Sequence, residues 1–209
     1  MLLKLRNSIR TEEFDYIFLK NALKKYKNPR VKINELLKKK NIIRVKKGLY
    51  VFGPELSREP YSKETLANLI YGPSYISLEY ALSFYGLIPE RIETVTSITN
   101  KRIKYFNTPI GNFSYKYINP AIYSYGITLY QINEYHNILI ASKEKALSDL
   151  LYFYDKINDE NEMQEYLFGN LRIEVSELSK LNVNKIRQFA KLYGKNVTIF
   201  FNYISKKLK

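Results

Sequence analysis

The 209-residue sequence contains no cysteine and only one histidine. Disulfide bonds, thiolate nucleophiles and cysteine-containing zinc sites are therefore excluded, and so is a metal site made of several histidines. The single histidine, His136, stands in NEYHNILIAS beside an expected strand. We interpret it as an ordinary loop or edge residue and not as a general base. We accordingly expect neither a metal nor a cofactor.

Long apolar runs are also missing. No stretch approaches about 18 apolar residues, the length that spans a bilayer, and charges interrupt the first apolar positions too early for a signal peptide. We therefore expect a cytoplasmic protein without a membrane partner. The length is sufficient for two small domains, each with a core of its own.

Acidic residues are scarce in the first part of the chain. Residues 1–60 contain 16 Lys and Arg against 6 Asp and Glu, whereas residues 61–209 contain 18 against 14. Between Lys20 and Lys47, twelve cations are accompanied by one carboxylate, that of Glu35. A lysine-rich composition of the whole chain does not explain this asymmetry. It favours a polyanionic partner for the N-terminal segment.

The basic segment also has the pattern of a small folded unit. Apolar residues at helical spacing predict helices within residues 1–13, over 19–26 and over 30–40, and Pro29 separates the last two. Residues 42–52 change to a period of two around a Lys-Lys-Gly turn, which predicts a β-hairpin.

A helix, a turn, a second helix and a basic hairpin form the order of a winged helix-turn-helix, which we expect over residues 1–56. In such domains the second helix lies in the major groove of double-stranded DNA, and the hairpin, or wing, approaches the backbone. The candidate DNA-binding residues are the polar and cationic residues expected on the outer side of the helix and on the wing. They are Arg30, Lys32, Asn34 and Lys38 on the helix, and Arg44, Lys46 and Lys47 on the wing.

The remaining residues, 57–209, predict an α+β domain whose end, 173–209, is helical; residues 53–62 read as a linker. Ser62 and Ser77 are expected to cap two helices, which Gly72 and Gly86 end. The expected strands cover 94–99, 110–118, 126–132 and 137–141, and the expected later helices cover 142–154, 161–168, 174–181, 184–193 and 196–207. The fold class predicted for the whole chain is α+β.

Five pieces of this second part, taken in order, resemble the antitoxin domain of the AbiEi family, the antitoxins of type IV abortive-infection toxin-antitoxin systems. With the basic unit before them, they extend over residues 14 to about 155. The pieces are Ser77-Leu78-Glu79 with Ala81-Leu82; Tyr85-Gly86-Leu87-Ile88-Pro89; Thr96-Ser97 with Thr99, Lys101 and Arg102; Thr108-Pro109 with Gly111 and Phe113-Ser114-Tyr115; and Ala141-Ser142 with Glu144-Lys145-Ala146-Leu147 and Asp149-Leu150-Leu151. Lys143 stands where the family is expected to have proline. The difference removes a residue that favours the start of a helix, and it changes no group with a chemical role.

The resemblance implies a DNA-binding antitoxin that acts in phage defence. It implies that the N-terminal domain represses the protein's own operon by binding promoter DNA at inverted repeats. It also implies that the second domain counters a nucleotidyltransferase-like toxin encoded beside it. The residues themselves leave open whether toxin and antitoxin touch.

Two other functions are compatible with the sequence. Glu79, Glu144 and Asp149, with Lys101 and Arg102, could compose a phosphoryl-handling site. Their positions in helical turns favour a structural role instead, and no glycine-rich phosphate loop or nucleophile elbow occurs, so we expect no enzyme. Lys101 and Arg102 follow a strand and are candidate contacts to DNA or to the toxin. The second alternative is an operator-binding regulator whose C-terminal domain senses a ligand or dimerises.

Overall fold

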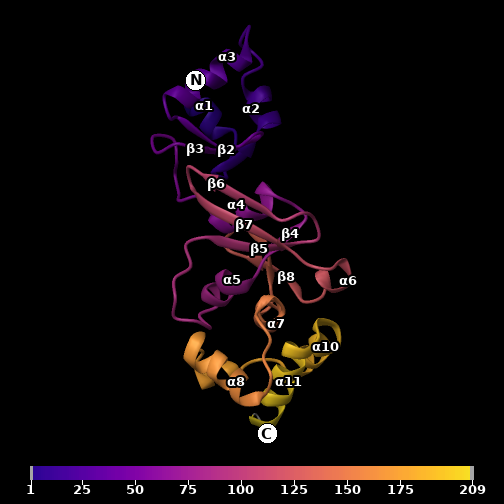
Figure 1. The fold of residues 1–209 in the computed structure, drawn as a ribbon. Helices are drawn as coiled ribbons and strands as arrows, with labels where there is room; N and C mark the ends of the chain where they lie inside the picture. The colour runs from indigo at the N-terminus through magenta and orange to yellow at the C-terminus, as the bar shows by residue number, and fades with distance from the viewer. Residues whose placement is uncertain (1, 208–209) are drawn as a thin grey trace.

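The computed structural model describes residues 2–207 and shows an α+β protein arranged in three tiers (Figure 1). The first tier contains three helices and a small sheet. A six-stranded sheet forms the second tier, and helices near the C-terminus form the third. None of the helices within residues 2–207 has the length and apolar character that crossing a bilayer requires.

The first tier is built on three helices and three short strands. The strands pair antiparallel in the order β1-β3-β2. The elements are α1 (Leu2–Asn7), β1 (Glu13–Asp15), α2 (Tyr16–Ala22), α3 (Pro29–Lys38), β2 (Ile42–Lys46) and β3 (Leu49–Phe52). The helix expected over 30–40 and the hairpin expected over 42–52 are confirmed. The helix expected over 19–26 lies earlier, because Asp15 caps α2 through a 2.7 Å bond from the Phe18 N–H.

Proline has a different role from the one expected at the start of α3. It does not stop the preceding helix, which has already ended at Ala22. Instead Asn28 is the N-cap of α3 and its side chain accepts the Val31 N–H at 3.4 Å, while Pro29 occupies the first turn. Proline suits that position because its fixed φ is helical and its missing N–H would have no partner there.

The hairpin of β2 and β3 has no free face, which distinguishes it from the expected wing. Alternate residues of β3 point to opposite sides. Tyr50 and Phe52 belong to the core of the first tier, and Leu49 and Val51 join the core of the second. The hairpin therefore connects the two cores, and the first tier is anchored to the rest of the chain by buried apolar contacts.

Glycine at position 53 allows the chain to leave this hairpin. The Gly53 N–H bonds to the Asn41 carbonyl oxygen at 2.8 Å, and a Cβ at residue 53 would lie 1.8 Å from the carbonyl oxygen of Lys40. Lys40 itself has a φ of 55° in the turn between α3 and β2. The close approach fixes the position of that turn relative to β3.

The second tier is a mixed sheet of order β6-β7-β5-β4-β9-β8. The pairs β5/β7 and β4/β9 are parallel and the other pairs are antiparallel. The short strand β4 and the exposed strand β6, which begins with Lys104, were not expected from the sequence. The elements are α4 (Lys63–Ile70), β4 (Ser74–Ile76), α5 (Leu78–Phe84), β5 (Val95–Thr99), β6 (Lys104–Thr108), β7 (Gly111–Tyr117), α6 (Pro120–Tyr123), β8 (Ile127–Gln131) and β9 (Asn137–Ala141).

The two serines expected to cap helices differ. Ser62 caps α4, since its Oγ accepts the Thr65 N–H at 3.0 Å. Ser77 occupies the N-cap position of α5 as expected, but its hydroxyl makes no capping bond and instead donates to the Asp149 carboxylate at 2.6 Å. The Ser77 hydroxyl binds the buried carboxylate on α7 (Lys143–Phe153), whereas the local sequence indicates a bond to a backbone N–H of its own helix.

The third tier surrounds one central helix, α7, which Ser142 caps. Every residue of α7 from Glu144 to Leu151 is buried, so this helix is the axis of the C-terminal half of the molecule. The elements are α7 (Lys143–Phe153), α8 (Glu160–Glu165), the π-helical turn η1 (Tyr166–Asn170), α9 (Val175–Leu178), α10 (Val183–Tyr193) and α11 (Lys195–Lys207). Helix α7 corresponds to the helix expected over 142–154, α8 and η1 to the one expected over 161–168, and α9 to α11 to the helical end expected over 173–209.

Candidate nucleic-acid interface

The outer face of α3 is the first part of the candidate interface. Arg30, Asn34 and Lys38 follow one another at helical spacing and are all exposed, whereas Ile33 and Leu36 are buried in the first core. Residues four apart lie one turn above each other on the same side of a helix. The three polar side chains therefore form a row that points away from the protein.

The fourth helix candidate, Lys32, lies beside this row and is already paired. Its Nζ donates to Glu35 Oε2 at 2.5 Å and lies 5.7 Å from the ring centre of Tyr26. The hydrogen bond raises the pKa of Lys32 and lowers that of Glu35. Because Glu35 is the only carboxylate between Lys20 and Lys47, this pair leaves the remaining cations of α3 without an acidic neighbour in that segment.

A groove beside α3 brings Asn34 and Arg44 together. Its volume is about 560 Å³, and it is bounded by α3, β2 and the turn between β6 and β7. Lys40, which is not among the candidates from the sequence, also lines the groove, and Pro109 of the second tier closes one side. Polar and cationic groups thus surround an apolar floor. Leu37, Ile42 and Ile43 form that floor.

Lys46 is half-buried, and its ammonium binds within the protein instead of being free as in the expected wing. Its ammonium donates to the carbonyl oxygen of Ile70, the last residue of α4, and burial lowers the pKa of Lys46. The carbonyls at a helix C-terminus lack intrahelical partners, and cations there are favourable. Lys46 therefore caps α4 across the junction between the tiers, and we leave it out of the candidate interface.

Lys101 binds the chain just beyond the same helix. Its Nζ donates to the Gly72 carbonyl oxygen at 2.8 Å, two residues beyond the carbonyl that binds Lys46. Lys47 and Arg102 stand next to these two lysines in sequence and are exposed. The expected wing and the expected Lys101–Arg102 site therefore meet around the end of α4, where Lys47, Lys101 and Arg102 are exposed.

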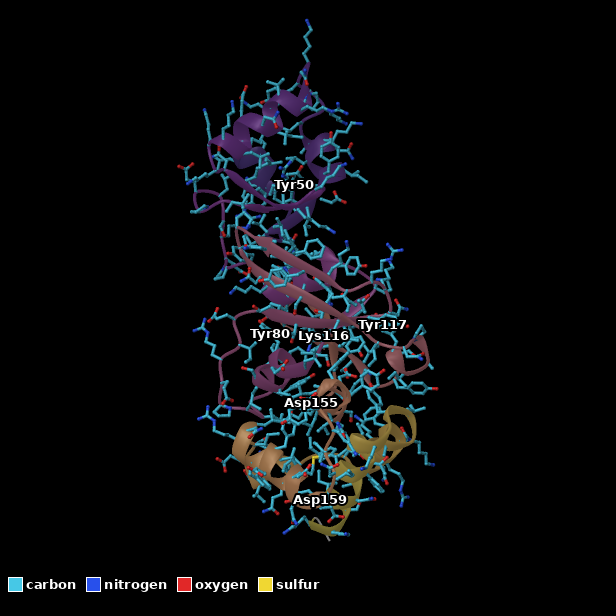
Figure 2. The ribbon with its side chains drawn as sticks, viewed as in Figure 1. Tyr50, Tyr80, Lys116, Tyr117, Asp155 and Asp159 are labelled. Carbon is cyan, nitrogen blue, oxygen red and sulfur yellow. The ribbon has the colours of Figure 1, made fainter. Side chains whose placement is uncertain are left out.

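Charge is distributed unevenly between the ends of the molecule. The helical row and the groove lie in or beside the first tier, whereas Asp155 and Asp159 are found near the C-terminal helices (Figure 2). Glu12 and Glu13 are both buried, which removes two of the six carboxylates of residues 1–60 from the surface, while the burial of Arg6 against Glu12 removes one cation. The exposed surface of that tier is consequently more cationic than its sequence alone indicates.

Asp149, one of the three carboxylates considered for catalysis, belongs to a closed network and not to an open site. Asp149 and Lys145 are completely buried, and their side chains are 3.3 Å apart. The Asp149 carboxylate also accepts bonds from three hydroxyls, those of Ser77 at 2.6 Å, Tyr75 at 3.1 Å and Tyr193 at 2.5 Å. Burial raises the pKa of Asp149 and lowers that of Lys145, and their mutual attraction opposes both shifts.

This network holds three segments together. Tyr75 and Ser77 flank the end of β4, Asp149 lies on α7, and Tyr193 ends α10. All hydrogen-bonding positions of the carboxylate are used, so no lone pair faces a substrate. Burying an ion pair is favourable only when its remaining polar atoms are satisfied, and this pair meets that condition. We assign the network to folding.

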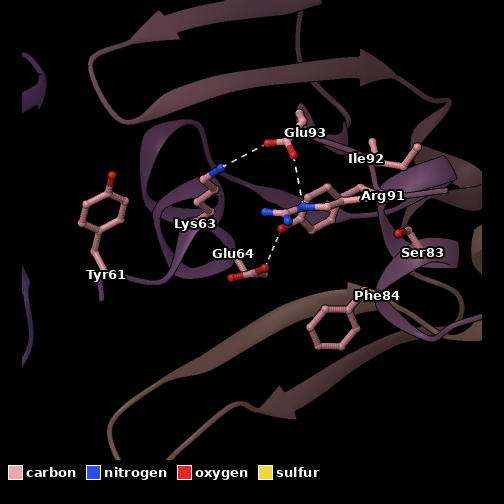
Figure 3. A pocket seen from close by; sticks show the side chains of 9 residues that line it. Tyr61, Lys63, Glu64, Ser83, Phe84, Arg91, Ile92 and Glu93 are labelled. Carbon is pink, nitrogen blue, oxygen red and sulfur yellow. Dashed lines mark hydrogen bonds and ion pairs between the residues drawn. The ribbon is translucent and has the colours of Figure 1, made fainter. Parts of the chain in front are cut away.

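A pocket of about 360 Å³ near α4 and α5 is polar but internally neutralised (Figure 3). Lys63 and Arg91 both approach Glu93, at 3.8 and 3.1 Å. Glu64 accepts the Tyr80 hydroxyl at 2.5 Å. Because each charged group shown already has a partner, the pocket offers no concentrated charge for a phosphate.

His136 is not an ordinary loop residue, contrary to the expectation. It is buried, and its Nε2 lies 2.5 Å from Glu13 Oε1 of the first tier. Its Nδ1 lies 2.9 Å from Asn133 Oδ1, an oxygen that also accepts two backbone N–H groups. Burial raises the pKa of Glu13, and the nearby imidazole opposes that shift. The pair joins the first tier to the second.

The chain matches no known family model, and no curated protein sequence is similar enough to indicate a family.

Proposed function

We propose that this protein is a DNA-binding antitoxin, which represses its own operon through a winged helix-turn-helix and counters a toxin with its second domain. The observation that carries the DNA-binding half is the exposed row Arg30, Asn34 and Lys38 on α3. Two cations at the ends of the row suit phosphate contacts, and the amide between them suits a bidentate contact to adenine.

Arg44 and Lys40 extend the proposed interface along the groove beside α3. The hairpin's buried position changes the role of the wing. Since Val51 and Leu49 fix it in the second core, we propose that it supports α3 and contributes Arg44 and Lys47 at its edge. A rigid support limits the motion of the reading helix and reduces the entropy lost on binding.

The residues that carry the family resemblance are explained mainly by folding. Ser77 binds Asp149 of the last piece, and Thr96 Oγ1 donates to the Ser77 carbonyl at 2.8 Å, which links three pieces in one hydrogen-bonded chain. Thr108 Oγ1 donates to the Gly111 carbonyl at 2.7 Å in the turn after β6. These contacts favour a shared scaffold, and the toxin-countering surface is proposed on the resemblance alone.

The proposed function is tested by co-expression with the neighbouring open reading frame. We expect that frame alone to arrest growth, the pair to restore it, and a promoter reporter to be repressed by the protein in the presence or absence of its neighbour. Growth and reporter signal are measured in the same cultures.

A variant with Arg30→Glu and Lys38→Glu separates the two halves of the proposal. It should lose repression and keep growth rescue, because the substitutions lie on α3 and leave the second domain intact. A neighbour that does not arrest growth, combined with normal repression, would favour an operator-binding regulator and contradict the antitoxin assignment.

A further inference from the structure

Strand β8 is an edge of the six-stranded sheet, and its outer ladder of backbone groups is unpaired within residues 2–207. We propose that a second copy of this chain pairs with it, β8 against β8, so that two sheets join into one. Three observations support this proposal: the phase of the free backbone groups, the absence of charge on the strand, and the self-complementary register that results.

The bonds beside the strand define which residues point outward. Ser142 N–H bonds to the Gly126 carbonyl, and Ile132 N–H bonds to the His136 carbonyl, both at 2.9 Å. Hydrogen-bonded pairs alternate with non-bonded pairs along an antiparallel ladder. The backbone N–H and C=O groups of Thr128 and Tyr130 therefore also point toward β9. Ile127, Leu129 and Gln131 therefore direct their N–H and C=O groups away from the sheet.

An independent contact confirms this phase on β9. The partner of Leu129 in the register is Leu139, whose backbone N–H and C=O also point away from β8. The side chain of Asn68 binds both groups, accepting from the Leu139 N–H at 2.8 Å and donating to its carbonyl at 3.2 Å. The protein thus covers the equivalent groups on β9 with an amide, and leaves those of β8 open.

The edge strand lacks the features that prevent strand pairing. Natural edge strands are protected by lysine, proline or bulges. Strand β6, at the opposite edge of the sheet, begins with Lys104 after Lys101 and Arg102. Strand β8 reads ITLYQ, without charge, proline or bulge, and Leu129 is 67% exposed.

The charge distribution selects a second copy as the occupant. One chain carries a net charge of +14, so two copies repel each other over most of their surfaces. Between Lys116 and Lys143 no Lys or Arg occurs, and the only carboxylate is that of Glu134. Exposed large side chains gather in this segment, which has no Lys or Arg. They are Tyr117, Tyr125, Leu129, Tyr130, Tyr135 and Leu139. The segment therefore offers an apolar surface on which two cationic copies can approach.

The outward residues are symmetric about Leu129. In an antiparallel pair of β8 strands related by a twofold axis, Leu129 would exchange both backbone bonds with the partner copy's Leu129. Ile127 would do the same with the partner copy's Gln131. Every open N–H and C=O of the strand would then be satisfied, and the symmetric contact closes after two copies.

Sedimentation or light scattering of the DNA-free protein tests this inference. We expect a mass approaching twice the 24.8 kDa of one chain as concentration rises through the micromolar range. Leu129→Lys places two like charges opposite each other at the centre of the contact, and should return the mass to that of one chain. Tyr105→Lys on β6, where Tyr105 is 59% exposed, adds the same charge at the opposite edge and should leave the mass doubled.

A second measurement does not depend on the folding of the lysine variant. In the unmodified protein, the amide of Leu129 should exchange with solvent at least tenfold more slowly at high concentration than at low, whereas the β9-bonded amide of Tyr130 should not change. An unmodified protein that remains a single chain at all concentrations would overturn the proposal, as would a folded Leu129→Lys variant that still doubles its mass. Both results are independent of DNA binding and of any toxin.

Discussion

Replacing Arg30 and Lys38 by glutamate is expected to weaken binding to double-stranded promoter DNA by at least ~100-fold, or about 2.8 kcal/mol. Both side chains are exposed on the outer face of α3. Each substitution removes an attraction to phosphate and adds a repulsion at the same position, so the two effects combine. Fluorescence anisotropy with a labelled promoter fragment at fixed ionic strength measures the change.

The matched control places the same change of charge at the other end of the molecule. Lys191 on α10 and Lys195 at the start of α11 are also exposed. Lys191→Glu with Lys195→Glu alters the net charge equally, and should change the affinity by less than about threefold because it affects only the long-range field. Equal losses in the two double variants would show that total charge, and not α3, determines binding.

Replacing Asp149 by alanine is expected to lower the free energy of unfolding by about 3–5 kcal/mol. The substitution leaves the fully buried ammonium of Lys145 without its counter-ion and removes the acceptor of Ser77 and Tyr193. Such a loss is a large part of the 5–15 kcal/mol that is usual for a folded domain. Urea unfolding followed by circular dichroism measures it.

A double variant tests whether the loss of stability comes from the unpaired charge of Lys145. Asp149→Leu with Lys145→Met removes both charges and keeps apolar volume, so it should be more stable than Asp149→Ala. If Asp149→Ala unfolded at the same urea concentration as the unmodified protein, the folding role assigned to this network would be wrong.

The sequence predicts those elements that depend on local pattern. The helix at 30–40 was predictable because Ile33 and Leu36 are spaced for one buried face, and the hairpin because its residues alternate around Gly48. The exposed row on α3 follows from the same periodicity. Short strands gave no such signal, since β4 has three residues and all of them are buried.

Contacts between distant segments were not predictable in this way. Lys46 has the same sequence character as Lys47, yet its ammonium binds the end of α4, which only the packing of the hairpin on the second tier determines. His136 and Glu13 are far apart in the chain, and nothing in either local sequence indicates their pairing. The helical pair Lys145 and Asp149 was identified from its spacing, but its complete burial depends on α10 and β4.

The salt dependence of promoter binding by the unmodified protein tests the central claim most directly. If the cationic row of α3 and its neighbouring lysines make about six phosphate contacts, the logarithm of the binding constant should fall with the logarithm of salt concentration with a slope near about −5, a loss of roughly 1,000-fold between about 50 and 200 mM. A binding constant that does not change over this range would contradict the account.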